Sequence, residues 1–247
     1  MNIRVIQTGE VQIKSRHVKA RHEARPARVL DVLTDRKWSP RLPIQCFVIE
    51  HPEGVIVVDT GESSRANDPG YQPWWHPFTR TSERRWVAPE EEVGPQLRRS
   101  GIDPNSVRWV VMTHMHGDHS GGLGHFPKSE IVMSASEAAM ALARTGPLNG
   151  YLNSHYPDWL DPRGVTFDAN PWEGFAASVP LTTDGAVRLI PAPGHTLGNL
   201  CVVVEQPEHL VLLAGDTAYS ERSLIDGVVD GVAQDAAAHR RTIALLQ

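Results

Sequence analysis

The 247-residue chain has a net charge of −5 at pH 7, so it lacks the excess of basic residues that favours a nucleic-acid-binding surface. No apolar run is long enough to cross a bilayer, and the N-terminus carries no apolar signal-peptide core. Both cysteines, Cys46 and Cys201, lie within apolar strand patterns, which favours buried thiols in a reducing compartment. We therefore expect a single domain over residues 1–247 in the cytoplasm, without nucleic-acid or membrane partners.

The N-terminal segments are predicted to form a strand, a charged arm and a hairpin. Residues 1–6 alternate between apolar and polar side chains, which favours a strand. Residues 16–41 mix basic and acidic side chains, which indicates a solvated loop or a docking arm. A homodimer formed through this arm remains an open alternative. Residues 44–49 and 55–58 are typical of the two strands of a β-hairpin.

The middle of the chain alternates between helical and strand patterns. Residues 89–100 predict a helix, because acidic residues fall in the first turn and arginines in the last, as the helix dipole favours. Apolar strands are expected over 107–112 and 131–133, and a helix over 136–144.

The C-terminal third predicts strands over 186–190, 200–204 and 210–214, followed by a helix from residue 232. Strands in two groups with helices between them favour an α/β (α+β) fold. The expected architecture is an αββα sandwich, in which two mixed β-sheets pack together and helices flank them. Several strand ends converge at one edge of such a sandwich, so polar residues that follow the strands can form a common site.

The most informative stretch is the sequence HMHGDH at residues 114–119, directly after an apolar strand. His114 and His116 are two residues apart, so in an extended segment they project to the same side and can share one metal ion. Asp118 and His119 follow at a different angle, and the glycine before them relaxes the backbone. Imidazole and carboxylate ligands suit zinc or another first-row divalent metal. The pattern therefore predicts a metal-dependent enzyme.

Two later segments place further ligand types after strands. His195 lies in the turn Gly-His-Thr, and Asp216 follows a strand and a glycine. Seen alone, an aspartate in that position is more often a turn or cap residue. In company with the histidine cluster, His195 and Asp216 instead predict convergence on one metal site.

The ordered set His-x-His-x-Asp-His, Gly-His-Thr and Gly-Asp resembles the metallo-β-lactamase superfamily, and the sequence VDTG at residues 58–61 resembles its early Asp-Thr-Gly turn. The similarity runs over residues 44–219. It implies the metallo-β-lactamase sandwich and two divalent metal ions, with zinc as the first candidate and iron, cobalt or manganese as alternatives. The implied ligands are His114, His116 and His195 for the first metal, Asp118 and His119 for the second, and Asp216 as a bridge between both.

The resemblance also bears on the C-terminal end. The superfamily places a final second-site histidine after one more helix, and this sequence does not contain it. The helical pattern still runs at Gln247 without a Gly, Asn or Pro stop signal, so we expect the domain to lack its last strand and helix. The second metal is then expected to be held less tightly than the first.

Tyr219 narrows the expected chemistry, because its position three residues after Asp216 resembles the N-acyl-homoserine lactonase branch. That resemblance implies a quorum-quenching lactonase, which opens an N-acyl-homoserine lactone or a similar ester through a metal-bridging hydroxide. Tyr219 and Asp118 are the expected catalytic residues. Tyr219 would hold the developing oxyanion, and Asp118 would pass a proton to the leaving alkoxide.

Aromatic residues are concentrated in irregular segments of the chain. We expect Trp74, Trp75 and Trp86 foremost to line an apolar pocket for an acyl chain.

Other functions remain open at the level of sequence. The same fold serves thioesterases, phosphotriesterases, β-lactamases and ribonucleases. A β-lactamase is less favoured, because Asp216 lies where some branches use a cysteine. A mono-iron persulfide dioxygenase and an inactive metal-binding module are the alternatives outside the hydrolases.

Overall fold

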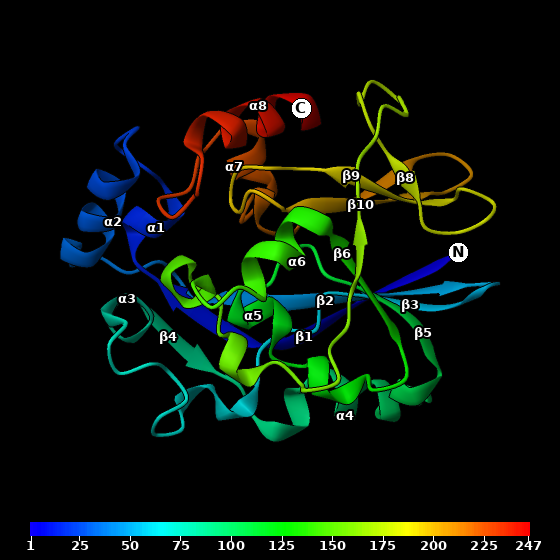
Figure 1. Cartoon of the computed structure of the whole chain (residues 1–247), viewed down its shortest axis with the longest axis horizontal. Coiled ribbons are helices and arrows are strands. Elements are labelled where there is room, and N and C mark those ends of the chain that lie inside the picture. The colour runs from blue at the N-terminus through cyan, green and yellow to red at the C-terminus, as the bar shows by residue number, and fades with distance from the viewer.

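Two β-sheets lie face to face, and helices cover their outer sides (Figure 1). The structure is a computed structural model that describes residues 1–247, apart from the side chain of Pro77. The larger sheet is formed by β1 (Asn2–Ile13), β2 (Leu42–His51), β3 (Gly54–Val58), β4 (Glu83–Trp86), β5 (Val107–Val111), β6 (Glu130–Ser134) and β7 (Arg163–Val165). Its order is β4-β1-β2-β3-β5-β6-β7, with antiparallel pairs from β4 to β3 and parallel pairs from β3 to β7. This sheet is mixed, as expected.

The smaller sheet is formed by β8 (Val179–Pro180), β9 (Val187–Pro191), β10 (Leu200–Glu205) and β11 (Leu210–Leu213), in the order β11-β10-β9-β8. All of its described pairs are antiparallel, whereas a second mixed sheet was expected. The reason lies in the connections. Residues 192–199 and 206–209 are too few for a parallel crossover, which needs about a dozen residues or more.

Eight α-helices occur in the described chain, joined by short 3-10 turns. They are α1 (Ser15–Val18), α2 (Arg25–Thr34), α3 (Pro77–Thr81), α4 (Val93–Arg99), α5 (Gly117–Ser120), α6 (Ala135–Ala141), α7 (Glu221–Ile225) and α8 (Ala236–Leu246). The helix expected over 89–100 is divided, because Glu92 is extended between a 3-10 turn and α4. The helix expected from residue 232 begins only at 236. There the side chain of Asp235 accepts a hydrogen bond from the backbone of Ala238 and caps the helix.

Three apolar layers establish the order helix, sheet, sheet, helix. Val93 and Leu97 of α4 pack against the outer face of the larger sheet. Between the two sheets, Ile56 and Val111 pack with Leu189, Val202 and other buried aliphatic residues. On the far side of the smaller sheet, a third cluster includes Ile190 and Val203, with Leu246 of α8 packed against it. The αββα sandwich is thereby confirmed.

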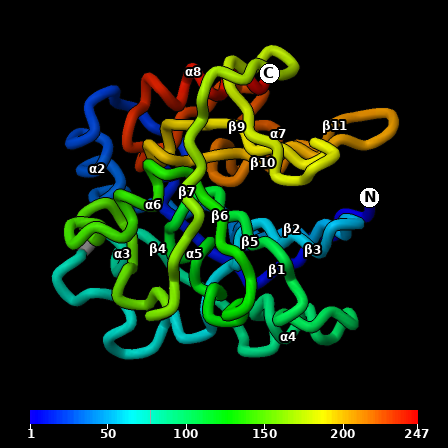
Figure 2. Tube along the Cα trace, turned by 45° about the vertical axis from the view of Figure 1, so that its right-hand side comes forward, coloured from blue at the N-terminus to red at the C-terminus, as the bar shows by residue number. Residues whose placement is uncertain are grey.

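The N-terminal arm, residues 16–41, lies against the C-terminal segment of its own chain. Figures 1 and 2 both show α1 and α2 beside the segment that leads into α8. The backbone of Gly231 donates a hydrogen bond to the carbonyl of His17 (2.7 Å), and that of Ala20 donates to Val229 (2.9 Å). The arm is thus a docked part of this domain rather than a solvated loop.

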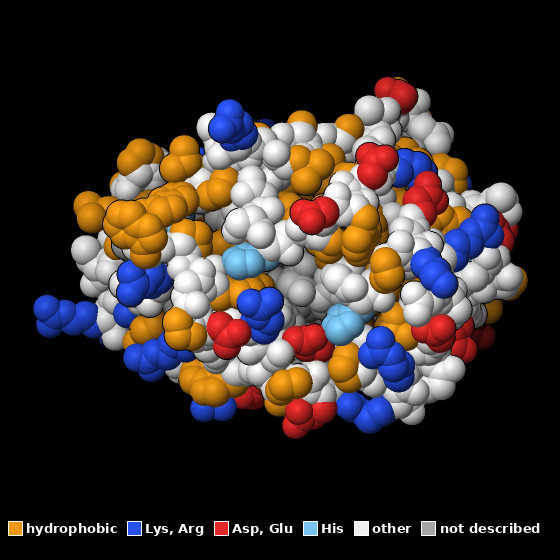
Figure 3. Space-filling model, turned by 60° about the horizontal axis from the view of Figure 1, so that its bottom comes forward, with side chains coloured by type: hydrophobic (Ala, Val, Ile, Leu, Met, Phe, Trp, Pro, Cys, Tyr) orange, Lys and Arg blue, Asp and Glu red, His pale blue; other side chains and the backbone are white. Residues whose placement is uncertain are grey.

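The described helices include none with the length and apolar character of a membrane span. On the face seen in Figure 3, basic and acidic side chains are interspersed rather than gathered into a basic band.

Candidate metal centre

The predicted ligands lie in loops that leave β5, β9 and β11 and meet at one edge of the sandwich. Glu137 of α6 connects two of these loops through hydrogen bonds. One oxygen of its buried carboxylate accepts from the backbone of Met115 (2.9 Å), and the other accepts from the hydroxyl of Thr196 (2.7 Å). The loop that carries His114 and His116 is therefore fixed relative to the loop that carries His195.

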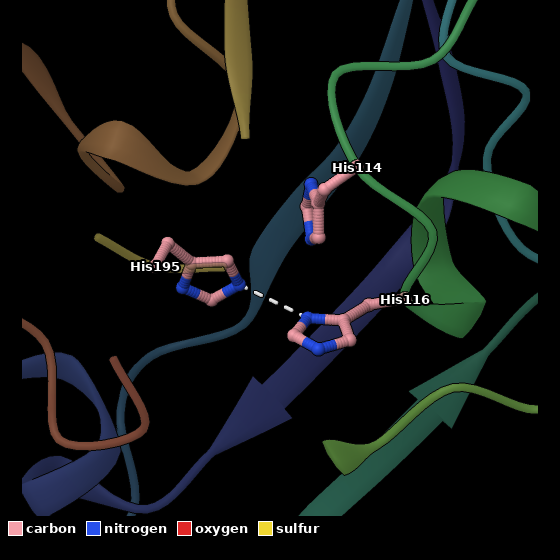
Figure 4. Close-up of side chains that lie close together, drawn as sticks. All are labelled: His114, His116 and His195. Atoms are coloured by element: carbon pink, nitrogen blue, oxygen red, sulfur yellow. Dashed lines mark hydrogen bonds between the residues drawn. The ribbon is translucent and has the colours of Figure 1, made fainter. Parts of the chain in front are cut away.

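His114, His116 and His195 form the first group, and their rings face one another in Figure 4. Nδ1 of His116 lies 3.0 Å from Nε2 of His195, and the ring of His114 lies 4.7 Å from each of the other two rings. Nε2 of His114 is buried without a hydrogen-bond partner in the described chain. Two nitrogens on one tetrahedral zinc are about 3.3 Å apart, given zinc–nitrogen distances of about 2.0 to 2.1 Å. The orphaned nitrogen and the close pair together fit a divalent metal.

His119 and Asp216, with His114, form the second group. Nε2 of His119 is 3.2 Å from Oδ1 of Asp216, while Oδ2 of Asp216 is 3.5 Å from Nε2 of His195. Asp216 thus presents one oxygen to each group, as a bridging ligand would. Asp118 lies farther out, with Oδ2 3.9 Å from Nε2 of His119. The backbone turns into α5 at residues 117–120, so the side chains of Asp118 and His119 point in a different direction from that of His116.

Asp59 fixes His119 from behind, a role that the sequence motif did not reveal. Its Oδ2 lies 2.9 Å from Nδ1 of His119, and the same carboxylate accepts from the backbone and hydroxyl of Thr113, both at 2.8 Å. Asp59 itself has a φ of 57°, a left-handed conformation that is rare for residues other than glycine. The Asp-Thr-Gly turn therefore supports the ligand loop rather than contacting a metal directly.

The loop of His195 is held by the segment before α8. Backbone amides of Gln234 and Asp235 donate to the carbonyls of His195 (2.9 Å) and Gly194 (3.1 Å). Nδ1 of His195 lies 3.0 Å from Oδ2 of the buried Asp230. No spacing in the sequence pointed to Asp230, because residues 226–231 show neither strand nor helix periodicity.

The electrostatic environment differs between the imidazoles. Burial, together with the charges of the neighbouring histidines, holds the pKa of His114 well below its usual range. Burial likewise lowers the pKa of His116 to about 3, with His195 contributing. Burial also disfavours charge on His195, but Asp230 and Asp216 outweigh it and raise the pKa of His195 to about 9. Asp216 and Asp59 similarly raise the pKa of His119 well above its usual range, against the effect of burial.

A cavity of about 590 Å³ opens onto both groups. Its polar end is lined by His116, Asp118, His119, His195, Asp216 and Tyr219. The hydroxyl of Tyr219 is buried without a hydrogen-bond partner in the described chain, and its ring centroid lies 6.4 Å from that of His195. Burial, followed by the charges of Asp230 and Asp216, raises the pKa of Tyr219 well above its usual range, so the phenol keeps its proton. It can therefore donate to a group in the cavity.

The apolar part of the cavity differs from the expected one. It is lined by Val11, Ile13, Phe47, Phe78, Leu152 and Leu224. In the described structure Trp74, Trp75 and Trp86 do not line it, so this prediction was wrong. Trp74 is 82% exposed, and Trp86 packs beneath the guanidinium of Arg41, 3.9 Å from the ring centroid.

Comparisons with known proteins agree with this architecture. Residues 39–246 match the metallo-beta-lactamase superfamily. A probable metallo-hydrolase of Mycobacterium tuberculosis is 32% identical over 186 residues, which are 73% of this chain and 58% of that protein. An N-acyl homoserine lactonase of Bacillus thuringiensis is 28% identical over 193 residues, which are 76% of this chain and 68% of that protein.

One solved structure shows the shared fold. It is an N-acyl homoserine lactone hydrolase with the product N-hexanoyl-L-homoserine bound at its catalytic metal centre. It aligns with a TM-score of 0.78 at 23% identity and covers 99% of this chain and 86% of that one. Because the superfamily match covers most of the sequence and the sandwich agrees with it, the chain belongs to the metallo-β-lactamase superfamily.

Proposed function

We propose that this protein is a metal-dependent hydrolase that opens the lactone ring of N-acyl-homoserine lactones or similar esters. One observation carries the proposal: two groups of metal-ligand type meet at His114, and Asp216 presents one oxygen toward each of them, at the polar end of a largely apolar cavity and beside the unpartnered hydroxyl of Tyr219. The similarity to lactonases supports the choice of substrate class.

The residues present suit two divalent metals, with His114, His116 and His195 on the first and His119, Asp118 and the shared Asp216 on the second. Zinc fits the imidazole-rich first group best. When bound, such metals supply a hydroxide nucleophile at neutral pH and polarise the ester carbonyl. Asp118 stands farthest from its group, so we expect the second metal to be the weaker one.

The remaining chemistry falls to side chains that line the cavity. The hydroxyl of Tyr219 donates a hydrogen bond to the carbonyl oxygen of the ester, which gains negative charge in the transition state. Asp118 also lines the cavity, where it can accept the proton that water releases as it attacks the carbonyl and pass this proton to the alkoxide that leaves when the ring opens. Apolar residues from β1 and β2 take up the acyl chain and exclude water from it.

The apolar lining predicts a dependence on chain length. Each methylene buried is worth about 0.8 kcal/mol, or about fourfold in affinity, until the cavity is full. Measuring kcat/KM for N-acyl-homoserine lactones of increasing acyl length therefore tests the cavity assignment. An efficiency that stays flat from short to long chains would contradict it.

The experiment that tests the function itself is a hydrolysis panel. Metal-analysed protein is assayed with an acyl-homoserine lactone, a thioester, a β-lactam and a phosphotriester, and oxygen uptake is followed with a persulfide. We expect the lactone to be turned over most efficiently. Preference for another substrate, or no turnover by the metal-loaded protein, would contradict the proposal.

A further inference from the structure

We propose, on the basis of the metal site of the proposed function, that Asp230 is a positioning residue that orients His195 and ties this orientation to the N-terminal arm. Asp230 belongs to residues 229–235, the segment between the arm and the His195 loop. It is a buried carboxylate (2% exposed) that lines no part of the cavity, so a substrate does not explain it.

The contact between Asp230 and His195 is made on the side of the ring away from the ligand cluster. Oδ2 of Asp230 lies 3.0 Å from Nδ1 of His195, while Nε2 of the same ring faces His116. A carboxylate at Nδ1 keeps a proton on that nitrogen and leaves the lone pair of Nε2 for a metal. Asp230 therefore selects the tautomer and the ring angle with which His195 can act as a ligand.

Asp230 is itself fixed by one further hydrogen bond, and His239 of α8 packs beside it. Oδ1 of Asp230 accepts from the backbone of Val232 (2.8 Å), which closes a tight turn around the carboxylate. Nδ1 of His239 lies 3.3 Å from Oδ2 of Asp230 without forming a hydrogen bond, while Nε2 of His239 donates to the carbonyl of Thr217 (2.9 Å). Because Thr217 follows Asp216 directly, His239 packs between Asp230 and the loop that carries Asp216.

The arm supports the same segment from outside, as Figures 1 and 2 show for α1, α2 and the approach to α8. Gly231 donates to the carbonyl of His17, and a side chain at Gly231 would overlap the carbonyl of Arg16. The guanidinium of Arg28, 2% exposed, donates to the carbonyls of Glu23 and Ala233. The buried guanidinium thus links the backbone of the arm at Glu23 to the backbone of residues 229–235 at Ala233 and holds this segment in place.

Zinc affinity tests the positioning role directly. Asp230→Asn keeps the shape but leaves one oxygen to serve both Val232 and His195. We expect it to weaken the tighter zinc site about 10- to 100-fold, measured by competition with a chromophoric chelator. We also expect a changed visible spectrum when cobalt is bound. The matched control is Glu92→Gln, which removes a carboxylate 2.8 Å from Nε2 of His125, a pair that belongs to neither the metal groups nor the cavity lining, and it should leave zinc affinity unchanged.

A purely structural role gives a different result. If Asp230→Asn lowers the melting temperature as Glu92→Gln does but retains the zinc affinity and the cobalt spectrum, the positioning role is overturned. Should the asparagine variant fail to fold, Asp230→Ser, which removes the carboxylate but keeps an oxygen that can accept from Val232, is measured instead, and wild-type zinc affinity with an unchanged cobalt spectrum would likewise overturn the positioning role.

The link to the arm is tested by Arg28→Met, which leaves every proposed ligand and Asp230 in place. We expect zinc affinity to fall several-fold, and an unchanged affinity would refute the coupling to the arm. Since these measurements follow zinc rather than turnover, failure of the lactonase proposal leaves them valid. A wild-type protein that binds no zinc would instead refute the proposed metal site.

Discussion

At the scale of single residues, the imidazoles of the two groups differ in how firmly they hold a proton. His114 and His116 are kept neutral by burial, whereas nearby carboxylates favour charge on His119 and His195. A metal ligand must offer a lone pair, so charged imidazoles have to lose a proton when a metal binds. Binding of a metal to these groups is therefore expected to release protons from His119 and His195.

This difference predicts a pH-dependent zinc affinity. At pH 7, below the pKa of about 9 of His195, the metal-free ring is protonated on both nitrogens, and zinc must displace the proton on Nε2. We expect proton release near pH 7 that declines as the pH rises through about 9, with apparent affinity rising over the same window. Calorimetric titration in two buffers with different ionisation enthalpies measures the protons released. Equal heats in both buffers at pH 7 would contradict the assignment.

Tyr219 offers the clearest test of a catalytic role. Removing one donor to the developing oxyanion costs on the order of 100-fold in rate, so Tyr219→Phe should lower kcat by that amount while metal content stays unchanged. Tyr71→Phe removes a tyrosine hydroxyl outside the cavity and serves as the control. Unchanged lactone kinetics in Tyr219→Phe would show that Tyr219 contributes only to packing.

At the scale of elements, the most sensitive contact is the approach of α8 to the turn before His195. Gly194 has a φ of 148°, and a Cβ there would overlap the Cα of His239. Gly194→Ala should therefore cost more than about 1 kcal/mol of stability, because both the backbone and the helix contact are strained. We also expect weaker zinc binding, since the His195 loop must move.

Gly70→Ala is the matched control for this element. Gly70 also has a positive φ, 85°, but no atom lies within 4 Å of the position of a Cβ. It should show the backbone cost without a change in zinc affinity. Thermal unfolding and chelator competition measure the two effects, and equal zinc affinities in both alanine variants would show that the α8 contact does not support the site.

At the scale of the whole molecule, alternation and apolar runs predicted most strands of the sandwich, because most of these strands bury at least one face. The side chains that the structure brings together, such as His114, His195 and Asp216, could be proposed because they directly follow those strands. The residues that hold these ligands in place could not be predicted. Asp230 and Glu137 act through tertiary contacts, and neither lies in a motif that marks its partner.

The error about the tryptophans has the same origin. The sequence around Trp74 and Trp86 shows no periodicity from which the direction of a side chain can be inferred, although Trp86 proves to be the last residue of β4, so neither could be assigned to the cavity or to the surface. The residues that do line the cavity include Val11 and Ile13, which alternate on β1 and therefore face the same side. Strand alternation would have been the better guide.

The most direct test of the central proposal is a zinc titration of metal-free protein in which bound metal and lactone hydrolysis are followed together. We predict no turnover without metal, one tightly held and one more weakly held zinc, and a hydrolytic rate that rises as the second site fills. Full turnover by the metal-free protein, or no lactone hydrolysis with two metals bound, would contradict the proposed function.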